Sequence, residues 1–253
     1  MKTVIFAGGF GTRLSEFTNK IPKPMVEIGG VPIIVHIMDH YAKYGFNDFV
    51  IALGYKHEYI KEYFYNFAYL NSDIIVNLKE NKVTTLSANK RDWKVTLIDT
   101  GLKTSTGTRL KKLEKYLDNE RFFLTYGDGV SSLNITNLLN HHINQNKLCT
   151  LTSVRPVAKF GELALDGDCV ESFEEKPQLV EGWINGGFMV MEPEVFNHIP
   201  DSDCMLEREP MNKLIESKNL ASFRHTGFWK CMDSKKDKDD LEDIWKENNG
   251  WPD

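Results

Sequence analysis

The chain has only four cysteines among its 253 residues, and they stand far apart without a CxxC pair. This spacing provides neither a zinc ribbon nor a disulfide framework, so we expect reduced thiols. No apolar run approaches the roughly 20 residues that span a bilayer. The apolar stretch near the first residue is also too short for a signal peptide. We therefore expect a cytoplasmic protein without a membrane partner.

A basic stripe is missing as well. The net charge of −5 and the pI of about 5.8 argue against a nucleic-acid partner. They leave nucleotides open, because a nucleotide needs only a few local cations. No Gly-Lys pair occurs, which excludes a Walker A loop, and the seven histidines form no HExxH motif.

The order of apolar patterns changes between the two halves of the chain. The first half alternates strand and helix, which predicts a mostly parallel sheet with helices on both faces. The second half has short strands, and Asp166-Gly167 between two of them predicts a hairpin. We expect one α/β domain with a small antiparallel extension in its second half. The expected strands are 2–7, 48–53, 94–99, 121–126, 148–154, 161–165, 169–173 and 184–191, and the expected helices are 31–44, 56–70, 107–117, 135–145, 208–217 and 234–246.

A glycine-rich loop follows the first strand. After Ala7 the chain reads Gly-Gly-Phe-Gly-Thr-Arg-Leu over residues 8–14, and Pro22-Lys23-Pro24 comes soon after. Glycines let backbone N–H groups approach an anion, and Arg13 and Lys23 add two cations, so the segment predicts a polyphosphate cradle. The dinucleotide pattern GxGxxG is incomplete because the third glycine is missing. A plain strand-to-helix turn is the alternative.

Two aspartates are candidate metal ligands. Asp128 stands between two glycines at the end of a predicted buried strand, where α/β sheets bind ligands, and could hold Mg²⁺. The alternative is a turn aspartate bonded to its own backbone. Asp233 follows an aromatic segment and could be a second ligand, or it could cap the helix after Ser234.

Candidates for a second substrate lie further along the chain. Lys176 could bind a phosphate, or it could belong to a solvated charged turn. Gly186 and Gly187 inside an apolar strand indicate close approach of a ligand, and Asn185 offers a donor and an acceptor to sugar hydroxyls. Two Asp-x-Asp sequences, at 166–168 and 201–203, are better explained as a hairpin turn and a polar loop.

Taken together, these segments resemble the sugar-1-phosphate nucleotidyltransferases, and among them the glucose-1-phosphate cytidylyltransferases. The pattern GGxGTRLxxxTxxxPKP over residues 8–24 is specific, and further matches follow in order to Met232-Asp233. The resemblance implies a Rossmann-like fold, with residues 1–147 as the nucleotide-binding half and 148–253 as the sugar-phosphate-binding half. It implies the reaction of CTP with α-D-glucose 1-phosphate to CDP-glucose and pyrophosphate, with Mg²⁺ as cofactor. It also implies a homohexamer and, downstream, dideoxyhexoses of surface polysaccharide such as the O-antigen of lipopolysaccharide.

The resemblance also assigns roles to residues. Arg13, Lys23 and Asp128 would be catalytic, and Asp128 and Asp233 would hold the metal. The residues that would bind the nucleotide are Ala7, Gly8, Gly9, Gly11, Thr12, Arg13, Lys23, Thr104, Arg109 and Asp128. Those that would bind the sugar phosphate are Tyr126, Glu175, Lys176, Asn185 and Gly186.

The chain departs from the family pattern at Ile21, Glu162, Lys230 and Cys231, and Glu162 and Lys230 put the identity of the sugar in doubt. The alternatives are a uridylyl- or thymidylyltransferase acting on a related sugar 1-phosphate, a glycosyltransferase that uses an Asp-x-Asp motif, and a non-catalytic sensor. A sensor would be expected to lose Arg13, Lys23 or an aspartate, and all are present.

Overall fold

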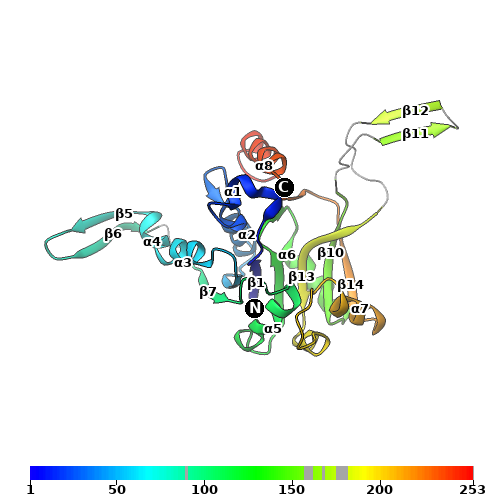
Figure 1. The fold of residues 1–253 in the computed structure, drawn as a ribbon, viewed down its shortest axis with the longest axis horizontal. Coiled ribbons are helices and arrows are strands. Elements are labelled where there is room, and N and C mark those ends of the chain that lie inside the picture. Colours follow the sequence, from blue (N-terminus) through cyan, green and yellow to red (C-terminus); the bar gives the residue numbers. More distant parts are fainter. Residues whose placement is uncertain (89–90, 157–161, 167–168, 175–181, 253) are drawn as a thin grey trace.

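A seven-stranded sheet forms the centre of the computed structural model, which describes residues 1–252 except 89–90, 157–161, 167–168 and 175–181 (Figure 1). Strands from both halves of the chain take part in it. In sheet order they are β14 (Leu220–His225), β10 (Cys149–Val154), β13 (Ile184–Met191), β8 (Phe122–Tyr126), β1 (Lys2–Ala7), β4 (Asp48–Leu53) and β7 (Lys94–Asp99).

Most neighbouring strands in this sheet are parallel. β8, β1, β4 and β7 run in one direction, and β10 is parallel to β14. β13 is antiparallel to both of its neighbours, β8 and β10. The predicted mostly parallel mixed sheet is confirmed.

Alternating side chains of the strands form two apolar layers. Ile5 and Ile51 belong to the layer under α2, α6 and α8, whereas Val4 and Val50 belong to the layer under α5 and α7. The central strands are therefore covered on both faces, which explains their continuous apolar sequences. The helices are α1 (Ser15–Thr18), α2 (Ile33–Ala42), α3 (His57–Tyr65), α4 (Phe67–Leu70), α5 (Thr106–Leu113), α6 (Ile135–Gln145), α7 (Glu209–Glu216) and α8 (Lys235–Asn248).

Three predicted helices are clearly longer than the observed ones. The helix expected over 107–117 ends at Leu113 and is followed by a 3-10 turn. The helix expected from residue 31 begins at Ile33, because Val31 and Pro32 are extended and pair with an earlier strand. The helix expected over 56–70 is interrupted at Asn66, which ends α3 and precedes α4. Short 3-10 turns lie at Thr12–Leu14, Lys23–Met25, Glu114–Tyr116 and Pro193–His198.

Four two-stranded antiparallel sheets complete the described fold. The hairpin of β11 (Glu162–Asp166) and β12 (Cys169–Glu174) confirms the predicted antiparallel extension, although its turn lies outside the described residues. A second hairpin, of β5 (Ser72–Asn77) and β6 (Lys82–Ala88), was not predicted. Both hairpins extend away from the body of the molecule (Figure 1). The other two pairs are β2 (Glu27–Ile28) with β3 (Val31–Pro32), and β9 (Gly129–Ser131) with β15 (Trp229–Cys231).

None of the helices in the described part of the chain combines the length and the apolar character that crossing a membrane would require.

Candidate functional site: a cavity at the carboxyl ends of the central strands

A cavity of about 500 Å³ opens at the carboxyl ends of β1 and β8. These two strands are parallel neighbours, with Phe6 beside Tyr126, so the loops that follow them leave the sheet side by side. The glycine loop after β1, Gly127 and Asp128 after β8, and the segment leading into α5 line the cavity. Ligands of open α/β sheets bind at this edge, so the sequence-based placement is confirmed for the two loops.

The glycine loop needs glycine at two positions for different reasons. Gly11 has φ of +63°, a left-handed conformation that favours glycine. The Thr18 hydroxyl donates to the Gly11 carbonyl at 3.0 Å and holds this turn. At Gly8 a Cβ atom would stand 2.3 Å from the Arg109 guanidinium, so a side chain there would have to displace Arg109 from its hydrogen bonds. Gly8 and Gly11 are thus held by contacts with Arg109 and Thr18.

Arg109 forms hydrogen bonds with the backbone of several loops around the cavity. It is buried, and its guanidinium donates to the carbonyls of Gly8, Leu53 and Leu102 and to the Thr100 hydroxyl at 2.6–3.3 Å. Burial lowers its pKa, against the neighbouring charges of Asp99 and Asp203. Arg109 therefore positions the backbone of three loops, and its predicted contact with a nucleotide stays a prediction.

Two carboxylates converge on one ammonium group at the mouth of the cavity. Lys23 Nζ lies 2.7 Å from Asp128 Oδ2 and 2.8 Å from Asp233 Oδ1. Arg13 Nη1 lies 3.1 Å from the other oxygen of Asp233, and the Arg13 side chain is 74% exposed. The structure thus brings together Arg13, Lys23, Asp128 and Asp233, four of the charged residues predicted for phosphate and metal binding.

The ion pairs decide the charge state of Lys23. Burial lowers its pKa, but the Asp128 charge and the hydrogen bonds to Asp128 and Asp233 outweigh this effect and raise the pKa above its usual value. Lys23 is therefore a cation throughout the neutral range. A cation held between two carboxylates also shows that this point attracts positive charge.

A small antiparallel pair of strands brings the two aspartates together although 105 positions separate them. β9 begins directly after Asp128 and pairs with β15, which ends two residues before Asp233. The Met232 N–H donates to the Asp128 carbonyl at 2.9 Å and continues the pairing. The alternative in which Asp233 caps α8 is wrong, because Ser234 is the N-cap and forms a capping box with Asp237.

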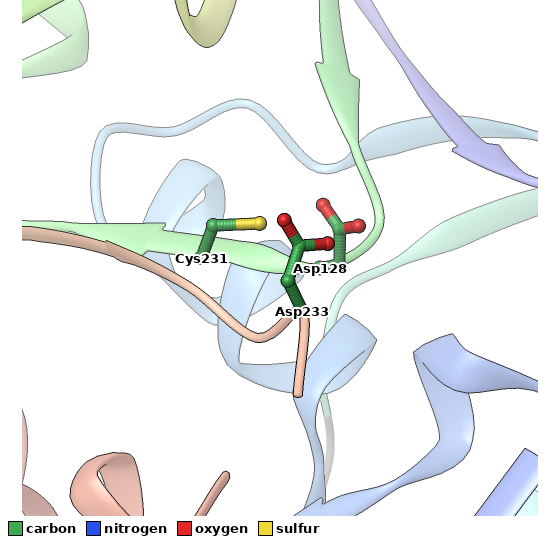
Figure 2. A group of neighbouring side chains, drawn as sticks. All are labelled: Asp128, Cys231 and Asp233. Atoms are coloured by element: carbon green, nitrogen blue, oxygen red, sulfur yellow. The ribbon is translucent and has the colours of Figure 1, made fainter. Parts of the chain in front are cut away.

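A third group faces the two aspartates. Figure 2 shows the Cys231 thiol directed toward the Asp233 carboxylate, with the Asp128 carboxylate beside it. One ligand atom from each of the three residues lies within 4.8 Å of the others, and all three are half-buried. The donor set therefore fits a divalent cation. Mg²⁺ would bind there through the carboxylate oxygens of the two aspartates.

Tyr126 forms part of the cavity wall toward the second half of the chain. Gly187 has φ of +84°, and a Cβ atom there would meet the Tyr126 ring at 2.6 Å. The neighbouring Gly186 is buried, and its carbonyl accepts a hydrogen bond from Trp229 Nε1 at 2.8 Å. The exposed Asn185 uses its carbonyl oxygen to accept from the Gly187 N–H at 2.9 Å. Gly187, which was predicted to allow close approach of a ligand, thus instead leaves room for the Tyr126 ring.

Sequence reasoning missed Glu207. Its carboxylate accepts a hydrogen bond from the Tyr126 hydroxyl with one oxygen and from the Thr106 hydroxyl at 2.6 Å with the other. Burial and the Glu207 charge both raise the pKa of Tyr126, so the tyrosine stays a neutral donor. No local motif marks Glu207, because it reaches the cavity wall from a turn before α7.

The remaining predicted residues have three outcomes. Ala7, Gly9, Thr12 and Thr104 line the cavity, so they are placed as expected, while their contacts with a nucleotide stay predictions. Glu175 and Lys176 lie outside the described residues. Lys230 departs from the family pattern and put the identity of the sugar in doubt, but its side chain pairs with Asp240 of α8 at 2.7 Å. The side chain of Glu162, the other such departure, lies outside the described residues.

The second Asp-x-Asp sequence has a structural role. Asp203 accepts hydrogen bonds from the N–H and the hydroxyl of Ser105 at 3.0 and 2.6 Å, just before α5. Asp201 pairs with Lys111 on the same helix at 2.7 Å. Both carboxylates thus hold α5 in place, which counts against their use as a glycosyltransferase metal motif.

Comparison with known proteins confirms the expected family. The model of the family described as "Nucleotidyl transferase" matches residues 2–237. A glucose-1-phosphate cytidylyltransferase from Salmonella typhi is 45% identical over 97% of this chain and 96% of its own length. A Bacillus subtilis (strain 168) protein named "Probable glucose-1-phosphate cytidylyltransferase" is 40% identical over 98% and 97%. The crystal structure of HddC from Yersinia pseudotuberculosis shares the fold with a TM-score of 0.68, at 23% identity over 96% of this chain and 99% of that one. With this length and degree of similarity, the chain belongs to the nucleotidyl transferase family.

Proposed function

We propose that this protein transfers a cytidylyl group from CTP to α-D-glucose 1-phosphate and releases pyrophosphate. The observation that carries the proposal is the convergence of Lys23, Arg13, Asp128 and Asp233 at the mouth of a cavity beside a glycine loop. The choice of cytidine and glucose is supported by the names of the relatives that are 45% and 40% identical over nearly the whole chain.

The chemistry that this cavity must perform is the approach of two polyanions. A phosphate oxygen of the sugar phosphate attacks the α-phosphorus of CTP in line and pyrophosphate leaves, so the sugar phosphate gains the cytidylyl group. The attacking oxygen is already anionic, and no general base or covalent enzyme intermediate is needed. Catalysis then consists of positioning and charge neutralisation.

Each charged residue has a task in this mechanism. The backbone N–H groups of the glycine loop and the exposed Arg13 would bind the β- and γ-phosphates that depart as pyrophosphate. Lys23 would turn its ammonium from the carboxylates toward the reacting phosphate. Asp128 and Asp233 would hold Mg²⁺, which as a Lewis acid neutralises charge on the phosphates. Tyr126, held by Glu207, would shape the wall against which the sugar phosphate lies.

We also propose that the chain associates with itself, as in the homohexamer that the resemblance implies. The β5–β6 hairpin extends from the body and carries exposed apolar side chains, among them Ile75 at 52% and Leu86 at 63% exposure. Apolar side chains on a projecting two-stranded hairpin favour burial against another surface. Self-association of the chain would supply that surface.

The decisive experiment measures pyrophosphate release from purified protein with Mg²⁺, crossing four nucleoside triphosphates with a panel of sugar 1-phosphates. Release with CTP and glucose 1-phosphate alone would support the full proposal. Release with UTP or dTTP, or with another sugar 1-phosphate, would keep the mechanism and change the substrates. If folded protein released none with any pair, the proposed function would be wrong.

A further inference from the structure

Cys231 occupies a position that the proposed reaction does not use. Its thiol lies in one cluster with the carboxylates of Asp128 and Asp233, with ligand atoms of the three residues within 4.8 Å of one another (Figure 2). It is also one of the four positions at which the chain departs from the pattern of the family it resembles. The cluster therefore offers a metal ion one sulfur ligand in addition to the two carboxylates.

The strand pairing fixes the direction of this thiol. Cys231 is the last residue of β15 and stands opposite Gly129 of β9, which has no side chain to cover it. Successive residues of a strand point to opposite faces. The neighbouring Lys230 points to α8 and pairs there with Asp240 at 2.7 Å, and Cys231 faces the two aspartates. The sulfur is thus held at the cluster by the backbone.

The centre of the cluster already holds a cation. The Lys23 ammonium lies within 2.8 Å of both carboxylates, which is the way a small positive ion would be held. A divalent cation that enters beside these oxygens competes with Lys23 and finds the Cys231 sulfur as a further donor. Thiolate ligands select metals such as Zn²⁺, whereas carboxylate and water oxygens suit Mg²⁺.

We propose that Asp128, Asp233 and Cys231 form a mixed oxygen and sulfur site that binds a thiophilic divalent cation such as Co²⁺, Zn²⁺ or Cd²⁺. This inference rests on the proposed function for the role of the two aspartates as metal ligands, and it adds a ligand that changes which metals the site accepts. On binding, the metal–sulfur bond replaces the S–H bond and the proton passes to the buffer. No oxidation takes place.

The test uses Co²⁺ as a spectroscopic probe. Purified full-length protein is titrated with Co²⁺, with and without CTP, and the near-ultraviolet absorption is recorded. Direct Co–S bonding gives a sulfur-to-cobalt charge-transfer band, which we expect in the wild-type protein and expect to disappear in Cys231→Ser. The dissociation constant for Co²⁺ should rise at least about tenfold, because even partners outside the first ligand shell contribute that much.

The matched control is Cys169→Ser, which removes an exposed thiol elsewhere in the chain and should keep the band. Cys231→Ala should also lose the band, which shows that the loss does not depend on the serine side chain, and circular dichroism verifies that the variant is folded. An unchanged spectrum in Cys231→Ser, or Co²⁺ bound to wild-type protein without the band, would overturn the inference. Pyrophosphate release reports on the proposed function separately, since the band needs no turnover.

Discussion

Strands β4 and β5 each contain six residues and are rich in valine or isoleucine, but only β4 buries them. Val50 and Ile51 of β4 are fully buried between two layers of helices, whereas Ile75 and Val76 of β5 are 52% and 50% exposed. β4 lies inside a seven-stranded sheet, and β5 has a single neighbour in a hairpin that leaves the body. The difference shows that burial follows from the layers around a strand rather than from its own composition.

The comparison extends to chemistry. The carboxyl ends of the central strands meet at one edge, which places Gly8, Tyr126 and Asp128 around one cavity. The β5–β6 hairpin lines no part of this cavity. Its apolar side chains therefore point to association, and the charged groups of the body point to catalysis. The following predictions test this division of roles.

The largest expected difference concerns stability. Ile51→Ala should lower the free energy of unfolding by about 2–5 kcal/mol, because it leaves a cavity in a covered layer. Ile75→Ala should change it by less than about 0.5 kcal/mol, as at exposed sites in general. Urea unfolding of both variants, at several protein concentrations, measures the two changes in the free energy of unfolding. Equal losses in dilute protein would contradict the comparison, whereas a loss for Ile75→Ala that grows with concentration would show that association covers the hairpin.

The second prediction concerns turnover. Asp128→Asn should lower kcat by about 100-fold or more, since the metal site loses a ligand charge and Lys23 loses a partner. Glu80→Gln, at the tip of the β5–β6 hairpin, is the matched control and should keep its activity. Steady-state pyrophosphate release measures both. Normal turnover in folded Asp128→Asn would remove this residue from the mechanism.

A smaller effect is expected at the cavity wall. Glu207→Gln weakens the acceptor for Tyr126 and Thr106, and should raise KM for the sugar phosphate about tenfold, the value of one charge-assisted hydrogen bond. KM for CTP should change much less. Glu209→Gln, two residues on, where the carboxylate pairs with Lys213 on the surface at 2.8 Å, serves as control. Equal changes of both KM values would mean that Glu207 supports the fold in general rather than the sugar side.

Local sequence patterns could predict the parts of the site that lie within one loop. The glycine loop and Asp128 each follow a buried strand directly, so the strand prediction also placed them at the correct edge. Asp233 was found as a candidate, but its position beside Asp128 depends on two strands of three residues each, which are too short to give a pattern. Glu207 and the contacts of Arg109 arise only from packing between distant segments, so no motif marks them.

The β5–β6 hairpin escaped prediction for a related reason. The spacing of apolar residues indicates a strand most clearly when one face is buried, and here residues on both faces are exposed. In the central sheet the buried strands such as β1 and β4 were predicted, whereas the half-exposed edge strand β14, with the sequence Leu-Ala-Ser-Phe-Arg-His, was not. Predictability from sequence therefore follows burial, except where a turn signal such as Asp166-Gly167 marks a hairpin.

The most gradual predicted effect is a dependence of stability on pH that arises from buried histidines of the body. Burial lowers the pKa of His40 on α2 to about 4, and those of His36 and His142 in the same direction. Between the ordinary value of 6.5 and about 4, the unfolded chain holds a proton on residue 40 that the folded chain lacks, so acid favours unfolding. The free energy of unfolding should fall by about 1 kcal/mol per pH unit for this group between pH about 6 and about 4. His40→Gln should make the dependence shallower in urea unfolding at a series of pH values, and an identical slope in both proteins would show that His40 gains no proton on unfolding. The β5–β6 hairpin contains no histidine, so the proton uptake belongs to the covered layers of the sheet.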